Sequence, residues 1–332
     1  MKLNNRRKLP IKLWGVILLA VLLLLLILSF CLGSENYSLQ EVYNALFNYR
    51  NIESHNIIRD IRIPREIAAV LVGMALACSG AIMQGVTKNA LADPSLLGLN
   101  AGASMVISIL LAINSGANFL ALMIAGFIGA VIGGSIVMLI GMSRRGGFNT
   151  MRIILAGAAV TALLTALADG IALFFKINQS ITFFIAGGVA GTTWQQIFYA
   201  APVIISVLLI TTIGARQLTA LSLGEEMAQG LGVNTGVIRT VFSILTMILA
   251  GVAVALVGSL AFVGLMVPHI ARFIVGTDYR LIIPFSALIG GTFIVIADIV
   301  ARMTGENPLG AIISLVGVPF FIYLVRRDGK IL

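Results

Sequence analysis

Few side chains in this sequence have the types and spacing that catalysis or metal binding requires. The two histidines, His55 and His269, stand far apart, and the two cysteines, Cys31 and Cys78, lie inside apolar runs. The sequence has no His-x-x-x-His pair, no Gly-x-Ser-x-Gly elbow and no two carboxylates within one apolar run. An enzyme needs such groups close together. We therefore expect neither an enzyme nor a protein with a resident metal ion or cofactor.

The stretch Gly-Ala-Ile-Met-Gln-Gly at 80–85 resembles the start of a phosphate-binding loop. Such a loop continues with lysine and then serine or threonine, because the lysine ammonium contacts the phosphates. Here Val86 and Thr87 follow instead. The sequence therefore predicts no nucleotide site in this chain, so another component must supply the energy for any ATP-driven function.

Four charged residues stand within or at the margins of apolar runs. Asp298 and Arg302 are four residues apart, which places them on one helix face in the acid-first order that pairs well. A structural pair and a contact with a partner both remain open. Asp169 precedes Lys176 by two helical turns and either pairs with it or lines an aqueous path. Ion-coupled carriers place acidic residues and broken helices near the membrane midplane, so this alternative has little support.

The composition indicates a membrane protein. Of 332 residues, 59% are hydrophobic and 11% are charged, against about 25% charged in soluble domains. Apolar runs near the ~20 residues that span a bilayer recur about ten times. We predict an all-α, polytopic membrane protein with about ten transmembrane helices, in one domain over residues 1–332. The expected spans are 13–33, 66–87, 96–113, 119–142, 152–175, 196–214, 238–258, 261–276, 281–300 and 308–325.

The basic residues indicate how these spans are oriented. The net charge is +9, but the lysines and arginines lie between apolar runs, and we expect no nucleic-acid partner. With ten spans, most of the 22 basic residues fall on the side of the N-terminus. Because cytoplasmic loops carry the excess of Lys and Arg, both termini are predicted to be cytoplasmic. The first apolar run is too long for a signal peptide and is interpreted as a retained span.

Two hydrophilic segments are long enough to contact partners. Residues 34–65 are predicted to be external and to include a surface helix. Residues 216–238 are predicted to form a cytoplasmic loop, in which Leu223, Met227 and Leu231 recur among acidic and small residues. This pattern is typical of a short amphipathic helix bounded by glycines. Such a helix packs on the membrane surface, forms a solvated turn or docks a partner.

Glycine is frequent, with 35 residues, and much of it stands at four-residue spacing. Small residues at this spacing let membrane helices approach closely. We therefore expect a compact bundle in which the span 119–142 packs closely on its neighbours. The two rows of small residues in this span are Ala125, Gly129 and Gly133, and Gly126, Ala130 and Gly134.

Seven motifs along the chain resemble one transporter family. They are R-I-P-R-E (62–66), S-G-A-I-M-Q (79–84), K-N-A-L-A-D-P-S-L-L-G (88–98), L-S-L-G-E-E-M-A-Q-G-L-G-V (221–233), F-V-G-L-M-V-P-H-I-A-R (262–272), A-D-I-V-A-R (297–302) and E-N-P-L-G (306–310). In this order they resemble the transmembrane permease subunits of FecCD/cobalamin-type ABC importers. The likeness runs from about Ile61 to Arg327. One departure is Ala90, where the family usually has proline.

The resemblance implies a fold, a function and partners. The fold is that of type II ABC importer permeases, in the bacterial cytoplasmic membrane. The function is import of an iron(III)-siderophore, with hydroxamate chelates favoured and haem or cobalamin as alternatives. The partners are ABC ATPase subunits, an extracytoplasmic substrate-binding protein, a second permease subunit, identical or related, and membrane lipid.

The same resemblance implies roles for particular residues. Those that couple to the ATPase are Leu223, Gly224, Glu225, Glu226, Ala228 and Gly232. Those that dock the binding protein are Arg59, Arg62, Arg65 and Arg302. Thr150 and Met151 are placed near the inner gate.

Overall fold

The computed structural model of the chain describes residues 10–33, 35–142, 150–177 and 187–328. All regular structure in these residues is helical. Eight helices are long and apolar enough to cross a membrane, and two shorter apolar helices, Leu99–Ile113 and Val263–Val275, accompany them. The prediction of an all-α protein with about ten spans is confirmed.

The apolar helices lie close to the predicted spans. They are α1 (Ile11–Cys31), α4 (Ile63–Thr87), α5 (Leu99–Ile113), α6 (Phe119–Met142), α7 (Thr150–Phe174), α9 (Trp194–Ser222), α11 (Thr235–Val257), α12 (Val263–Val275), α13 (Tyr279–Met303) and α14 (Leu309–Asp328). The shorter elements are α2 (Leu39–Phe47), α3 (Glu53–Asn56), the π-helix η1 (Ile57–Arg62), the 3-10 helix η2 (Pro94–Leu97) and α10 (Glu225–Gly230).

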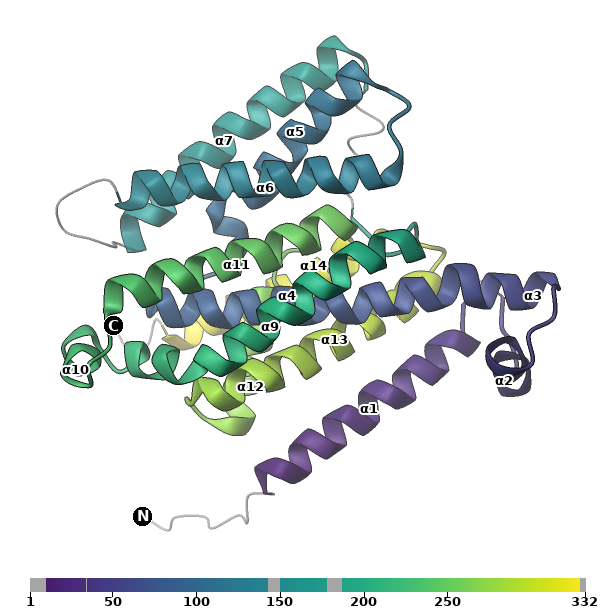
Figure 1. Ribbon diagram of the computed structural model, residues 1–332, viewed down its shortest axis with the longest axis horizontal. Coiled ribbons are helices and arrows are strands. Elements are labelled where there is room, and N and C mark those ends of the chain that lie inside the picture. The colour runs from purple at the N-terminus through teal and green to yellow at the C-terminus, as the bar shows by residue number, and fades with distance from the viewer. Residues whose placement is uncertain (1–9, 34, 143–149, 178–186, 329–332) are drawn as a thin grey trace.

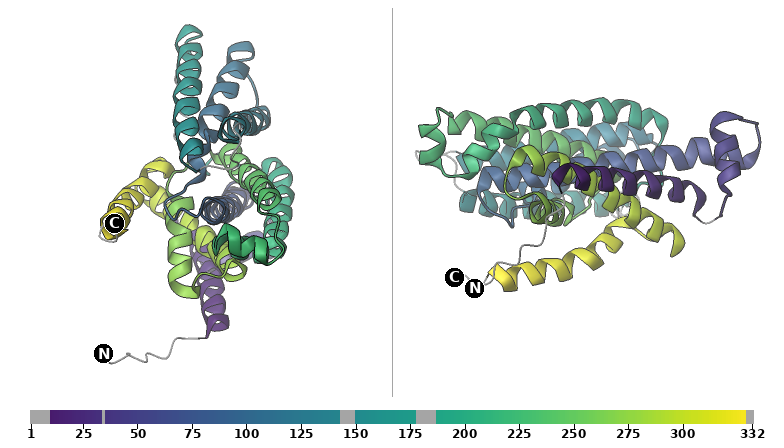
Figure 2. Two further views of the ribbon diagram at one scale, coloured as in Figure 1. Left: turned by 90° about the vertical axis from the view of Figure 1, so that its left-hand side faces the viewer. Right: turned by 90° about the horizontal axis from the view of Figure 1, so that it is seen from below.

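Helix α4 runs through the middle of the bundle (Figure 1 and Figure 2). Most of its residues are buried, and α9, α11, α12 and α13 pack against it. Glycines make the closest contacts: Gly73 meets the backbone of Gly290 and Gly291, and Gly80 meets that of Gly264. A side chain at either position would collide with main-chain atoms. Glycine therefore determines how closely α12 and α13 approach α4.

Helices α5, α6 and α7 pack together on one side of the bundle (Figure 2). Gly129 of α6 meets the backbone of Gly102 in α5, and Gly133 meets the backbone of Gly98. The close packing predicted for this row of small residues is thus confirmed at Gly129 and Gly133.

Two turns interrupt the bundle, one before α5 and one before α12. The first ends at Gly98, and the second runs from Gly258 to Phe262; all three residues have a left-handed φ, of 71°, 76° and 66° respectively. A hydrogen bond joins the two neighbourhoods, because Asn100 Nδ2 donates to Ser259 Oγ over 2.8 Å. The two interruptions therefore lie side by side within the bundle.

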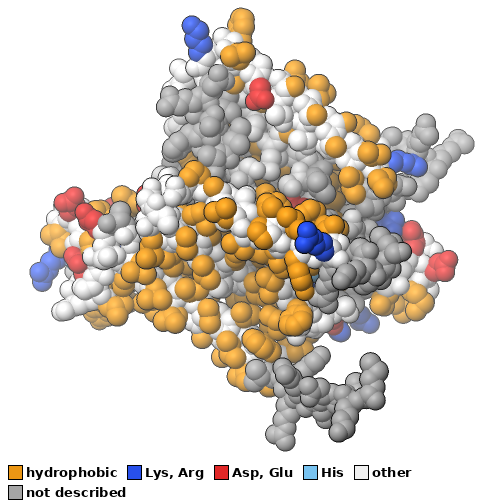
Figure 3. All heavy atoms as spheres, turned by 180° about the vertical axis from the view of Figure 1, so that it is seen from behind, with side chains coloured by type: hydrophobic (Ala, Val, Ile, Leu, Met, Phe, Trp, Pro, Cys, Tyr) orange, Lys and Arg blue, Asp and Glu red, His pale blue; other side chains and the backbone are white. Residues whose placement is uncertain are grey.

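The peripheral helices present apolar side chains outward. Only 11% of α1 is buried over its most apolar window, against 83% for the span that contains α4. Exposed aliphatic side chains are also numerous on α7, α9 and α14, and Figure 3 shows hydrophobic atoms over much of one face. Such a surface is suited to lipid, so this is a multi-pass membrane protein.

The two hydrophilic segments lie at opposite ends of the bundle (Figure 1). Helices α2 and α3 stand at one end, and α10 and the end of α14 stand at the other. The predicted topology requires this relative placement. Which end faces the cytoplasm and the assignment of the chain to a single domain stay predictions. We call the α2 end the outer end and the α10 end the inner end.

Replacing Gly73 by valine is expected to destabilise the protein, because the new side chain would collide with the backbone of α13. Overpacking of this kind costs roughly 1–3 kcal/mol. The melting temperature of the detergent-solubilised protein measures the effect. Gly170→Val is the control, since nothing lies within 4 Å of a Cβ placed there. Equal melting temperatures for the two variants would contradict the close contact of α4 with α13.

Candidate functional site

The outer end holds a cluster of charged side chains, four of them buried and one exposed, which we call the outer ionic cluster. Its members are Arg65, Glu66, Asp298, Arg302 and Glu306. Arg65 bonds to both carboxylate oxygens of Asp298 over 2.9–3.1 Å, and to Glu306 through Nη1 (3.1 Å) and Nη2 (2.8 Å). Because one rigid guanidinium serves two carboxylates, it holds α4, α13 and the loop after α13 in one register.

Arg302 connects the outer ionic cluster to α1. Its Nε lies 3.1 Å from Asp298 Oδ2, so the predicted pair is present, and its Nη2 contacts Glu66. Its Nη1 donates to the carbonyl oxygens of Ser29 (3.0 Å) and Leu32 (3.1 Å). These carbonyls lie at the end of α1, where a helix leaves acceptors unpaired. Arg302 therefore caps α1 while it pairs with α4 and α13.

Arg62 contacts the same end of α1 from a different element. It is the last residue of the π-helix η1, and its Nη1 donates to the carbonyl oxygen of Phe30 over 2.8 Å. Its Nη2 donates to the carbonyl oxygen of Glu35, and its guanidinium lies 4.4 Å from the centre of the Tyr37 ring. A cation at the carboxyl end of a helix also interacts favourably with the helix dipole.

Three of the four arginines predicted to dock a partner are therefore buried. The exposed fraction is 5% for Arg62 and Arg302 and 6% for Arg65. Their docking role stays a prediction, and the structure adds a condition to it: a partner reaches them only if an internal contact gives way. The sequence reasoning left Glu66 and Glu306 unassigned, although both stand within the motifs R-I-P-R-E and E-N-P-L-G.

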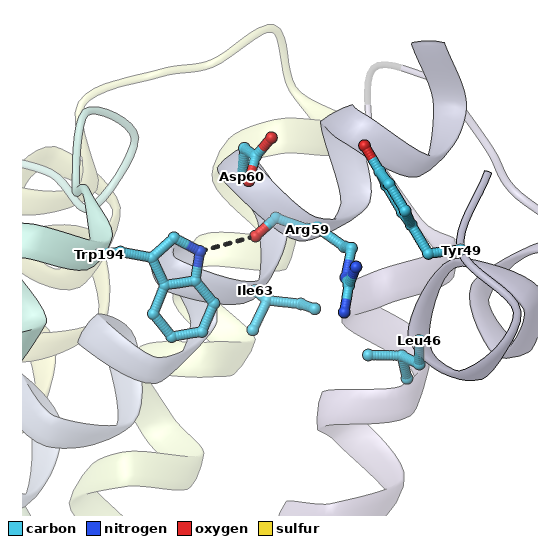
Figure 4. A pocket seen from close by; sticks show the side chains of 6 residues that line it. All are labelled: Leu46, Tyr49, Arg59, Asp60, Ile63 and Trp194. Atoms are coloured by element: carbon cyan, nitrogen blue, oxygen red, sulfur yellow. Dashed lines mark hydrogen bonds between the residues drawn. The ribbon is translucent and has the colours of Figure 1, made fainter. Parts of the chain in front are cut away.

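Arg59 differs from the other three because it lines an open cavity of about 570 Å³ (Figure 4). The cavity lies between α2, η1 and the start of α9. The Arg59 guanidinium lies 4.7 Å from the centre of the Tyr49 ring, and the Trp194 indole N–H donates to the Arg59 carbonyl oxygen over 2.9 Å. An aromatic face thus supports a cation at an opening. The lining residues are Leu46, Tyr49, Arg59, Asp60, Ile63 and Trp194.

At the inner end, α10 projects from the bundle (Figure 1), and the predicted short amphipathic helix is present there. Leu223, Met227 and Leu231 are 62%, 61% and 63% exposed, whereas Ala228 is buried. Met227 lies within α10, Leu223 precedes the helix at the end of α9, and Leu231 caps its carboxyl end. We call them the α10 patch.

Polar contacts attach α10 to α11. The Glu225 carboxylate accepts hydrogen bonds from Thr235 Oγ1 and Arg239 Nη2, each over 3.3 Å. Gly224, with φ 126°, and Gly232, with φ 78°, begin and end the projecting segment in conformations that favour glycine. Of the two predicted coupling carboxylates, Glu225 thus serves an internal contact, and Glu226 is exposed.

The end of α9, from which α10 follows, is also tied to α13. Thr219 Oγ1 donates to Asp278 Oδ1 over 3.1 Å and accepts from the Tyr279 N–H over 3.0 Å. A hydrogen bond from Arg280 lowers the pKa of the Asp278 carboxyl, so this acceptor stays ionised at neutral pH. These bonds hold the end of α9, from which α10 follows, against the start of α13.

The predicted gate residues stand at the beginning of α7. Thr150 is the first residue of that helix, and its side chain lies outside the described residues. Met151 is 64% exposed. Further along the chain, Asp169 and Lys176 are exposed. The gate role of Thr150 and Met151 stays a prediction.

An apolar helical bundle with a projecting helix at one end, and a charged cluster and a cavity at the other, is the arrangement of a multi-pass membrane permease. The described residues bring no three potential His, Cys, Asp or Glu metal ligands together. Residues 21–327 match the FecCD transport family. The chain belongs to that family.

Individual relatives cover nearly the whole chain. It is 45% identical, over 95% of its length and 84% of the relative's, to the iron(3+)-hydroxamate import system permease protein FhuB of Bacillus subtilis (strain 168). It is 36% identical to the hemin transport system permease protein HmuU of Yersinia pestis, over 93% and 95% of the two lengths. An inward-facing structure of a metal-chelate type ABC transporter matches with a TM-score of 0.83 and 25% identity, covering 95% of this chain and 99% of that one. The predicted ABC importer permease fold is confirmed.

Replacing Asp298 by asparagine is expected to destabilise the protein by about 3–5 kcal/mol, because Arg65 and Arg302 then lose a buried ionic partner. The free energy of unfolding in mixed micelles measures this loss. Asp278→Asn is the matched control, since its partner Arg280 has a side chain that is 64% exposed and exposed pairs contribute ~1 kcal/mol or less. Similar losses in both variants would contradict the structural role of the outer ionic cluster.

Proposed function

We propose that this chain is the permease subunit of an ATP-driven importer that carries an iron(III)-siderophore, of the hydroxamate type, across a bacterial cytoplasmic membrane. The observation that carries the proposal is the 45% identity to a hydroxamate permease over 95% of the chain. The hemin permease shares 36% identity, so haem is an alternative cargo. Cobalamin is the other alternative that the family offers.

ATP hydrolysis belongs, in this proposal, to separate ATPase subunits that bind the α10 patch. The patch places three apolar side chains in an exposed position at the end opposite the Arg59 cavity. Such side chains bind strongly when a partner surface excludes water around them. Gly224 and Gly232 shape the segment, Ala228 anchors it, and Glu226 remains exposed for a polar contact. These features support the predicted coupling role.

The bonds that attach α10 would transmit its motion to the membrane spans. Closure of two ATPase subunits would displace α10, and the bond of Glu225 to Arg239 joins α10 to α11. The chain itself joins α10 to α9, whose end is bonded to Asp278 before α13. A displacement of α10 is thus shared by three spans, which favours one of two orientations of the permease halves.

An external binding protein, a second permease subunit and the lipid bilayer complete the proposed assembly. The Arg59 cavity is an accessible cationic feature for docking an acidic partner. Exposed charge pairs contribute only ~0.2–1 kcal/mol each, so such contacts orient the partner and speed its encounter. The second permease, a copy of this chain or a relative, would complete the transport path, and both termini would be cytoplasmic.

Reconstitution of the complete complex into liposomes tests the function. Uptake of a ferric hydroxamate should require the binding protein and ATP hydrolysis, and should persist when an ionophore collapses the proton gradient. Haem and cobalamin, each with its own assay, serve as competing cargoes. Uptake that continues without the ATPase and stops with the ionophore would establish the ion-coupled alternative instead.

Replacing Met227 and Leu231 together by serine should weaken ATPase association about tenfold or more, because each apolar side chain buried at an interface removes apolar surface from water. The amount of ATPase that co-purifies with the permease, titrated over ATPase concentration, measures the change. Gln229→Ser is the control, since it alters the same short helix outside the α10 patch. Unchanged association in the double variant would remove the docking role of α10.

A further inference from the structure

Three of the arginines predicted to dock the binding protein are buried, so an acidic partner cannot reach them without a change in their internal contacts. Arg62, Arg65 and Arg302 are 5–6% exposed, and each is bonded within the chain. Displacing a fully buried carboxylate would leave two charges without partners, which is strongly unfavourable. A carboxylate of the partner can therefore replace an internal carboxylate only where that internal carboxylate is accessible to water.

Glu306 is the member of the outer ionic cluster that meets this condition. Its side chain is 45% exposed, whereas those of Asp298 and Glu66 are 1% and 0% exposed. Arg65 divides its donors between the two kinds of acceptor: Nε and Nη2 serve Asp298, and Nη1 and Nη2 serve Glu306. Glu306 thus lies between the Arg65 guanidinium and the solvent at the outer end.

The backbone around Glu306 allows its side chain to be released. Glu306 has φ 58°, and Gly305 before it has φ 97°. A non-glycine residue in the left-handed region is held there at some cost, and its contacts must compensate. The adjoining residue is fixed independently of Glu306, because the Asn307 N–H donates to the Ala301 carbonyl oxygen over 3.3 Å and Asn307 Nδ2 donates to that of Thr304 over 2.9 Å. The side chain of Glu306 can therefore leave without unravelling the loop.

We propose that Glu306 is an exchangeable carboxylate, which occupies Arg65 in the free permease and is replaced there by an acidic side chain of the external binding protein. The inference rests on the proposed function, since it presupposes that such a protein docks. Asp298 keeps its bonds to Arg65 throughout, so no buried charge is left unpaired during the exchange. Glu306 moves to water, where a free carboxylate is well solvated.

Two variants of one residue test the exchange. Glu306→Gln removes the competing charge, and Glu306→Asp keeps the charge but shortens the side chain so that it no longer reaches Arg65. Both should bind the binding protein about two- to fivefold more tightly than the wild type, which corresponds to the loss of an exposed ion pair. The dissociation constant is measured with the complete permease–ATPase complex in lipid nanodiscs, at low and at physiological ionic strength.

Glu53→Gln is the control, because Glu53 is an exposed carboxylate at the same end and stands in α3, away from the loop after α13. Tighter binding by both Glu306 variants, and not by the control, supports the exchange. Equal tightening by Glu306→Gln and Glu53→Gln, with no effect of Glu306→Asp, would show a general charge effect and overturn it. Normal docking of the wild type with unchanged Glu306 variants overturns the exchange alone, whereas no docking by any of these proteins overturns the docking proposal as well.

Discussion

The need to pair charges that are removed from water governs the outer end of this protein, and the rest of the packing agrees with it. Arg65 and Asp298 are 233 positions apart in the chain, yet each is almost fully buried against the other. Buried ions are tolerated only when their partners are in place, so α4 and α13 must pack in the register that joins this pair. In that register Gly73 also faces Gly290. Electrostatics and close packing therefore favour the same arrangement.

The two ends of the bundle are fastened by different chemistry. At the outer end, guanidinium groups join α1, α4 and α13, and they satisfy the carbonyls at the end of α1. At the inner end, hydrogen bonds such as Thr219 to Asp278 and Arg239 to Glu225 join α9 to the start of α13 and α11 to α10. The middle is apolar, and its closest contacts are made by glycine. Fold and proposed function are compatible, since buried ion pairs hold the outer end together, while hydrogen bonds at the inner end connect α10 to the spans that it would move.

Local rules predicted much of this structure. The eight long apolar helices of the described residues follow from the length that a bilayer requires, the short helix α10 was predicted from apolar residues that recur among acidic and small ones, and the pair of Asp298 with Arg302 follows from four-residue spacing. Tertiary partners were beyond such rules. The spacing along one segment cannot show that Arg65 meets Glu306 from a loop 241 positions away. The sequence alone therefore could not reveal that Arg62, Arg65 and Arg302 are buried.

The two turns beside α5 and α12 have a consequence for the bilayer itself. A helix of 13 residues, such as α12, is ~20 Å long at 1.5 Å per residue, which is shorter than a hydrocarbon core of ~30 Å. Peptide groups in the preceding turn cannot face acyl chains unsatisfied. The hydrogen bond from Asn100 to Ser259 places two polar side chains beside this turn. Within the membrane, these turns must consequently face neighbouring helices or a water-filled space and not acyl chains. Leu260 in the second turn is buried and Ser259 is half-buried.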